Sequence, residues 1–297
     1  MAGRKPFCAD VSRANAEPLG ATASRVESWI LVEYRGVWSR ELLAESGLSN
    51  AVKSHLREQV DALPRSRLLF VRRPERRLTP GFAVFVARSR ERDAELRGLE
   101  VPDYDDLRRL DLTADPGEPV RHPLLVVCTH GMRDRCCSLY GRPLYDELRA
   151  EAGEEWIWQS SHVGGDRFAG NLVCLPEGLY FGRVGRADVW SLLDEYLAGR
   201  IDLAHYRGRS CYEFAVQAAE RRVREDTGVT GIDDLVLAGA DRSGEGAWRV
   251  EFVAGGELHE VDVVEELGEL TYLTCDAAIP RRPRRFVAAS RRVRATA

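Results

Sequence analysis

The stretch from residue 124 to residue 151 constrains the fold of this chain most strongly. It begins with Leu124–Cys128, a continuous apolar run of strand length that is typical of a strand buried on both faces. A polar loop over residues 129–135 leads into a helix expected at about 137–151, where Leu139, Leu144 and Leu148 share one face. The pattern therefore predicts a buried strand, a polar loop and a helix that covers the strand.

Further elements continue this pattern toward residue 197. Apolar runs predict strands at 156–159, 172–175 and 179–181 and a helix at about 187–197. The sequence Pro176-Glu-Gly178 supplies a hairpin turn between the last two strands. The resulting order, β-α-β followed by β-β-α, is the element order of a thioredoxin-like fold.

The whole chain, at 297 residues, is longer than one compact core usually requires. We expect an α/β (α+β) protein in four parts: an N-terminal α/β unit (1–116), a thioredoxin-like domain (117–202), a small C-terminal α+β unit (203–280) and a basic tail (281–297). The turn Asp115-Pro116-Gly117 marks the first boundary. The tail holds seven arginines, and we expect a solvated, disordered end rather than an arm that binds nucleic acid.

Composition restricts the partners and the compartment. The 47 acidic residues outnumber the 43 basic ones, so no overall basic field favours nucleic acid. No apolar run approaches the ~20 residues of a membrane helix, and the N-terminus carries no secretory signal. We therefore expect a cytoplasmic protein with neither nucleic acid nor membrane as partner. In that compartment its seven cysteines indicate ligands, redox groups or core residues rather than disulfides.

Soft metal ligands concentrate in the loops that follow two neighbouring strands. Cys128, Cys136 and Cys137 lie in or beside the first loop, and His162 and Asp166 lie in the second. Because parallel neighbouring strands bring their C-terminal loops together, two thiols, an imidazole and a carboxylate can form a four-ligand site. The other interpretation stays open: Cys136 and Cys137 are small core residues at a helix start, and His162 caps a turn.

Ordered motifs across most of the chain resemble the sucrase/ferredoxin-like family. They are densest between about residues 124 and 186 and continue more thinly to Tyr206-Arg-Gly-Arg-Ser210. The motifs are Cys128-x-His130-Gly-x-Arg133-Asp134-x-Cys136-Cys137, Gly141-Arg142-Pro143-Leu144, Ser161-His162-x-Gly164-Gly165-x-Arg167-Phe168-Ala169, Leu175-Pro176-x-Gly178 and Gly182-Arg183.

The resemblance implies a thioredoxin-fold ferredoxin whose [2Fe-2S] cluster is held by two cysteines nine residues apart and a His-x3-His pair. Cys128 and Cys137 match the cysteines, with Cys136 as the neighbouring alternative, and His162 matches the first histidine. Asp166 stands at the second histidine position. A carboxylate is an anionic, hard donor and should lower the reduction potential, whereas histidine raises it.

Three functions follow, in order of preference. The first is a [2Fe-2S] electron-transfer protein that serves an unknown redox partner protein; the second is a thiol-redox or zinc-binding protein that uses the same ligands. The third is a non-redox member whose site has decayed at Asp166 and binds no metal. Sucrose hydrolysis requires a fixed pair of carboxylates, and no motif here supplies one, so we expect a redox protein rather than a hydrolase.

Other polar residues of the motifs admit two roles each. Arg133 and Arg167 either stabilise an anionic cluster and dock an acidic partner, or form a surface ion network with Asp134. His130 either donates to a cluster sulfur or caps its loop, and we favour the cap. The four isolated cysteines are expected to be structural: Cys8, Cys174, Cys211 and Cys275.

Overall fold

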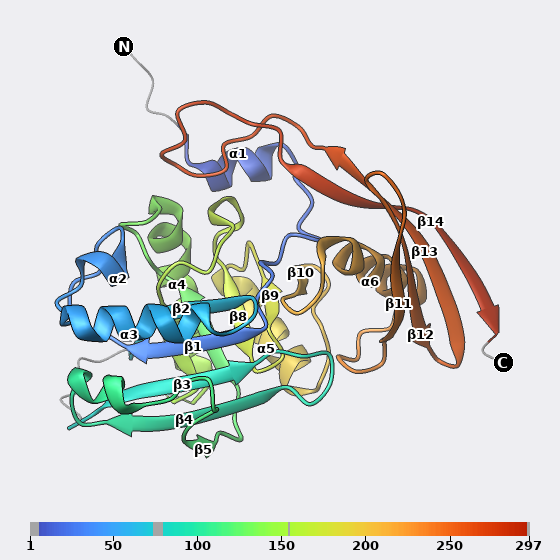
Figure 1. Ribbon diagram of the computed structural model, residues 1–297. Coiled ribbons are helices and arrows are strands. Elements are labelled where there is room, and N and C mark those ends of the chain that lie inside the picture. The colour runs from blue at the N-terminus through green and yellow to red at the C-terminus, as the bar shows by residue number, and fades with distance from the viewer. Residues whose placement is uncertain (1–5, 74–79, 154, 296–297) are drawn as a thin grey trace, which may run out of the picture.

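The computed structural model describes residues 6–73, 80–153 and 155–295 and shows a mixed α/β (α+β) fold (Figure 1). Its strands form a ten-stranded sheet in the order β10-β9-β8-β6-β7-β2-β1-β3-β4-β5 and a four-stranded sheet in the order β11-β12-β13-β14. The fold class predicted from the sequence is therefore confirmed. No described helix has the length and apolarity that a bilayer crossing requires.

One half of the large sheet has the predicted thioredoxin-like arrangement. β6 and β7 run parallel on either side of the α4 crossover, β8 is antiparallel to β6, and β9 is antiparallel to β8. The elements are β6 (Leu124–Cys128), α4 (Arg135–Glu151), β7 (Ile157–Ser160), the 3-10 helix η2 (Asp166–Phe168), β8 (Leu172–Leu175), β9 (Leu179–Phe181), the 3-10 helix η3 (Arg186–Asp188) and α5 (Val189–Leu197).

The other half repeats this arrangement, which the sequence analysis did not anticipate. β1 and β2 are parallel around the α3 crossover, β3 is antiparallel to β1, and β4 is antiparallel to β3. The elements are α1 (Cys8–Ala14), β1 (Ser28–Glu33), α2 (Leu42–Glu45), α3 (Asn50–Asp61), β2 (Ser66–Arg72), β3 (Phe82–Arg88), β4 (Glu95–Val101), the 3-10 helix η1 (Tyr104–Arg109) and β5 (Glu118–Pro119).

The two halves join where β2 pairs antiparallel with β7. Because this pairing is continuous, strands from the predicted units 1–116 and 117–202 share one sheet. Strand β10 (Tyr206–Arg209), from the predicted unit 203–280, extends the same sheet beside β9. The unit boundaries at 116 and 202 stay predictions, but the sheet crosses both.

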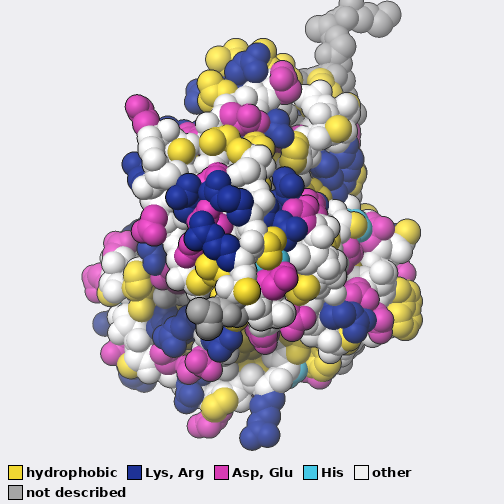
Figure 2. Space-filling view, turned by 90° about the vertical axis from the view of Figure 1, so that its right-hand side faces the viewer, with side chains coloured by type: hydrophobic (Ala, Val, Ile, Leu, Met, Phe, Trp, Pro, Cys, Tyr) yellow, Lys and Arg dark blue, Asp and Glu magenta, His cyan; other side chains and the backbone are white. Residues whose placement is uncertain are grey.

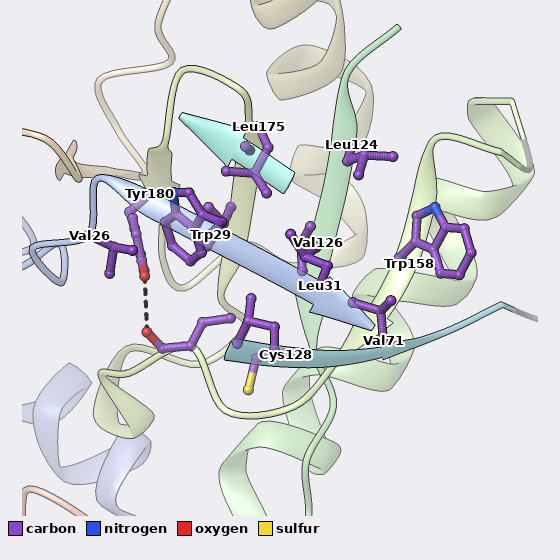
Figure 3. Packing of buried hydrophobic residues seen from close by; sticks show 14 of the residues in the cluster. Val26, Trp29, Leu31, Val71, Leu124, Val126, Cys128, Trp158, Leu175 and Tyr180 are labelled. Atoms are coloured by element: carbon purple, nitrogen blue, oxygen red, sulfur yellow. Dashed lines mark hydrogen bonds between the residues drawn. The ribbon is translucent and has the colours of Figure 1, made fainter. Parts of the chain in front are cut away.

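The large sheet curls, so that strands far apart in the sheet order share one core. Trp29 of β1 and Tyr180 of β9 have ring centroids 6.1 Å apart, although β8, β6, β7 and β2 lie between their strands in the sheet order. Figure 3 shows Leu31, Val71 and Val126 directed into this core, with Cys128 at its border. Alternate residues of the same strands face the outer layer of helices, where α3 covers β1 and β2 while α4 and α5 cover β6 and β8.

The second sheet and helix α6 form a separate C-terminal layer. Ala219 and Val223 of α6 pack against Phe252 and Val261 of the sheet. The elements are α6 (Phe214–Thr227), β11 (Val236–Gly244), β12 (Ala247–Ala254), β13 (Glu257–Leu267) and β14 (Arg284–Ala295).

The expected solvated end at 281–297 is wrong for most of its length, since residues 284–295 form β14 against β13. Phe286 stacks on Phe214 of α6, and Arg292 pairs with Glu260 and Asp262 of β13. Figure 2 shows basic side chains gathered beside acidic ones on the side of the molecule that carries this sheet. The arginines that suggested a free tail are therefore, in part, cross-strand ion-pair partners.

Gly141 allows α4 to lie close against β6. A Cβ atom at this position would stand 2.0 Å from the backbone oxygen of Cys128. We expect Gly141→Ala to lower the free energy of unfolding by about 2 kcal/mol, since a clash with backbone outweighs the ~1 kcal/mol that alanine gains in a helix. Urea denaturation measures the change. Gly47→Ala is the control, because its Cβ would make an ordinary 3.5 Å contact; equal stability of the two variants would contradict the prediction.

Candidate metal centre

Two loops meet at the C-terminal ends of β6 and β7, as the parallel pairing requires. Cys128 ends β6 directly opposite Ser160, which ends β7. After Cys128 the chain enters α4 through Asp134, whose carboxylate Oδ1 accepts the backbone N–H of Cys136 at 2.8 Å. An aspartate at this position satisfies a free amide of the first helical turn. The cap therefore fixes where Cys136 and Cys137 begin the helix.

Four predicted ligands come together at this point. The ligand atoms of Cys128, Cys137 and His162 all lie within 4.8 Å of one another. The Cys137 Sγ atom lies 3.2 Å from Asp166 Oδ1, and His162 Nδ1 lies 3.0 Å from the same oxygen. Cys128 and Cys137 are each 1 % exposed, whereas the His162 side chain is 26 % exposed. We call Cys128, Cys137, His162 and Asp166 the loop site; its thiols are buried and its imidazole reaches the surface.

Charges within the loop site favour a thiolate at Cys128. A hydrogen bond from the Cys137 thiol lowers the pKa of Cys128 well below its ordinary value, with a further contribution from His162. The same hydrogen bond and burial raise the pKa of Cys137. Burial alone would lower the pKa of His162, but Asp166 and Cys128 outweigh it and raise that pKa to about 10. The contacts within the loop site therefore favour the ionised forms of Cys128 and His162.

The second loop owes its shape to two glycines and to bonds with the core. Gly164 and Gly165 have φ angles of +99° and +80°, which side chains with a Cβ atom rarely adopt. Between His162 and these glycines, the backbone oxygen of Val163 accepts hydrogen bonds from Tyr180 Oη at 3.1 Å (Figure 3) and from Arg67. These bonds anchor the segment that carries His162 and Asp166.

Arg207 of β10 is a buried cation behind this loop. Its guanidinium donates to the backbone oxygens of Gly164 and Thr22 and to Asn171 Oδ1, at 3.1, 2.5 and 2.8 Å. Burial lowers the pKa of Arg207 to about 10, although Asp166 opposes that shift. Arg207 was not predicted to lie near the site. It is part of the family motif Tyr206-Arg-Gly-Arg-Ser210, which could have indicated it.

Several predicted residues contact other partners. The Cys136 thiol contacts Cys8 and Cys275, at 3.6 and 3.2 Å, on the side of α4 away from Cys137. Arg133 pairs with Glu41, and Arg167 pairs with Glu17. The proposed surface network with Asp134 is not found in these contacts, because Asp134 is buried as the helix cap.

His130 caps its loop, which is the role that we favoured over donation to a cluster sulfur. Its Nε2 atom lies 2.7 Å from the backbone oxygen of Ser39, and its ring meets Trp38 edge-on at 5.6 Å. Its backbone oxygen accepts the N–H groups of Arg133 and Asp134. His130 therefore ties the loop before α4 to the segment after β1.

Fold and site together define a thioredoxin-like protein with buried cysteine, histidine and aspartate groups that could hold a metal ion. The chain belongs to the sucrase/ferredoxin-like family, whose model matches residues 19–208. The resemblance inferred from the motifs is thus confirmed.

Curated relatives cover part of the chain. The chain is 36 % identical over 106 residues to "Altered inheritance of mitochondria protein 32" of Eremothecium gossypii, which covers 31 % of this chain and 34 % of that protein. It is 33 % identical over 101 residues to the protein of the same name in Meyerozyma guilliermondii, over 31 % of this chain and 36 % of that protein. The chain therefore matches about a third of the length of these relatives. No solved structure matches significantly.

Proposed function

We propose that the chain binds a [2Fe-2S] cluster at the loop site and acts as an electron-transfer protein. The observation that carries this proposal is the close grouping of two thiols and an imidazole at the ends of β6 and β7, with the Asp166 carboxylate beside Cys137 and His162. When bound, such a cluster supplies one-electron redox chemistry. Membership of the sucrase/ferredoxin-like family supports this choice of cofactor.

The donor set fits this cofactor. Cys128 and Cys137 offer two thiolate ligands from the strand end and the helix start, on the inner side of the site. His162 and Asp166 offer one nitrogen and one oxygen from the second loop. Cys136 does not belong to the loop site, because its sulfur contacts Cys8 and Cys275 instead. Cys137 is therefore the second cysteine ligand in our proposal.

The surrounding residues suit an anionic centre. Arg207 is a buried positive charge whose pKa the nearby Asp166 raises, and a nearby cation stabilises added negative charge. The imidazole of His162 is the most exposed of the four groups. We propose that an as yet unidentified redox partner protein approaches the site from the His162 side, since electron transfer favours the shortest path.

Zinc at the same four residues is the second candidate. Sulfur, nitrogen and oxygen donors all bind Zn²⁺ in tetrahedral sites. The close spacing of Cys128, Cys137 and His162, within 4.8 Å of one another, is compatible with one ion. A thiol-redox or structural role would then replace electron transfer.

The visible spectrum of protein purified without oxygen from iron-sufficient cells tests the proposal. We expect a brown protein with about two irons and two sulfides per chain, whose absorption bleaches on reduction with dithionite. Iron, acid-labile sulfide and zinc are measured on the same sample. Colourless protein that contains zinc at the loop site and no sulfide would select the zinc function, and folded protein with neither metal there would contradict both.

A further inference from the structure

A second buried group of ligands lies on a neighbouring face of the α4 N-terminus. Cys8, Asp134, Cys136 and Cys275 place one ligand atom each within 4.8 Å of one another. Their residues are between 0 and 3 % exposed. We call these four residues the terminal site, because they join segments near the two ends of the chain to α4.

We propose that the terminal site binds one zinc ion, with three thiolates and the Asp134 carboxylate as ligands. Neither Cys8 nor Cys275 lies within residues 19–208, the part of the chain that the family model matches. This site is separate from the loop site and does not depend on the cofactor that the loop site holds.

The spacing of the three sulfurs favours a single tetrahedral ion. The Sγ atoms are 3.6 Å apart for Cys8–Cys136, 3.2 Å for Cys136–Cys275 and 3.7 Å for Cys8–Cys275. Zinc–sulfur bonds of about 2.3 Å in tetrahedral geometry put neighbouring sulfurs about 3.8 Å apart. A disulfide requires about 2.05 Å, and all three cysteines are free. The triangle therefore needs only small side-chain shifts to accept zinc.

Asp134 supplies an oriented fourth ligand. Its two oxygens accept the backbone N–H groups of Cys136 at 2.8 Å and Cys275 at 2.6 Å. The Cys8 sulfur lies 3.9 Å from both oxygens. A carboxylate oxygen keeps a further lone pair after one hydrogen bond, so these bonds hold the carboxylate in place without using up its capacity for a metal.

The small apolar cluster around the terminal site favours a stabilising ion. Helix α1 has seven residues, and in Figure 1 it lies beside the long connection between β13 and β14, which carries Cys275. The apolar cluster between them is small: Cys8, Ala9, Cys136, Ala169 and Cys275, with three partly buried aromatic residues. Small packed units commonly rely on a metal or a cross-link. Zinc would fasten both segments to the helix that carries Cys137.

Positive charge partly balances the proposed site. Three thiolates and a carboxylate around Zn²⁺ leave two negative charges. The N-terminus of the 17-residue helix α4 points at the group and favours anions.

Metal analysis of the full-length protein, purified without chelators from zinc-supplemented cells, tests the proposal. We expect about one zinc per chain and a fall to about a tenth of that in Cys275→Ser, since removal of a ligand costs at least as much as the 10–100-fold of an outer-shell change. Iron and sulfide in Cys275→Ser stay at their native level. Cys211→Ser, which changes a cysteine outside both sites, is the control and retains zinc.

Cobalt and thiol labelling keep the test valid if Cys275→Ser folds poorly. Co²⁺ added to metal-stripped Cys128→Ser protein should produce the visible bands of tetrahedral thiolate coordination. In native protein, Cys8, Cys136 and Cys275 should react with iodoacetamide only after a zinc chelator is added. The proposal is overturned if native protein lacks zinc, if Cys275→Ser keeps it, or if mass spectrometry finds a disulfide among the three cysteines in freshly purified protein. Loss of iron alone would instead affect only the loop-site proposal.

Discussion

Replacing Cys128 with serine is expected to abolish the visible absorption of anaerobically purified protein. Cys128 is 1 % exposed at the end of β6, and its neighbour Cys137 lowers the pKa of its thiol. A serine hydroxyl does not ionise at neutral pH and is a poor ligand for iron in a cluster. Iron and sulfide per chain should fall by about tenfold or more, in line with the cost of weaker changes around metal sites. Absorption spectra with iron and sulfide assays measure the effect.

Cys174→Ser is the matched control for this variant. Cys174 lies in β8, is also fully buried, and pairs with Leu125 of the adjacent strand β6. It is not among the loop-site ligands. It therefore reproduces the burial of a hydroxyl without removing a ligand. Far-ultraviolet circular dichroism reports whether each variant folds. If folded Cys128→Ser retains the native absorption, Cys128 is not a ligand.

Replacing Asp166 with histidine is expected to preserve the absorption and raise the reduction potential by on the order of 100 mV. The reason is the charge of the ligand: a carboxylate stabilises the ferric state, and a neutral imidazole does so less. Asp166 Oδ1 already contacts both Cys137 and His162, at 3.2 and 3.0 Å, so a ligand at this position needs little movement. Spectroelectrochemical titration measures the potential.

Asp146→His provides the control for the change in net charge. Asp146 lies on the exposed side of α4, where water and salt screen its effect. The reduction potential of the Asp146→His protein should match that of the native protein. An Asp166→His protein with an unchanged potential would show that Asp166 is not bound to iron. Cluster loss in Asp166→Asn with retention in Asp166→His would support ligation strongly.

The thioredoxin-like half could be predicted from the sequence because its signals are local. The apolar run at β6, the helical spacing of α4 and the turn before β9 each act within a few residues, and Figure 1 shows these elements in the predicted order. The meeting of the Cys128 and His162 loops also followed, since parallel strands bring the same ends together.

The repeated architecture of the N-terminal half was not predicted, since the sequence indicated only an α/β unit over residues 1–116. Its strand order depends on which strands pair, and Trp29 meets Tyr180 only because the sheet curls. Strand β14 was missed for a related reason. Its arginines suggested a solvated tail, because the sequence does not show that Glu260 and Asp262 of β13 lie opposite the strand and pair with Arg292.

By itself, the sequence determined the family and the α/β class, because motifs and periodicity are properties of neighbouring residues. It also marked Cys128, His162 and Asp166 as candidate ligands, with either Cys136 or Cys137 beside them. Tertiary structure alone decided which thiol belongs to which group. Cys136 and Cys137 are adjacent in the chain, yet successive helical residues point about 100° apart, so one meets Cys128 and the other meets Cys8 and Cys275. Those two partners lie 128 and 139 residues away from Cys136, a separation that no local pattern records.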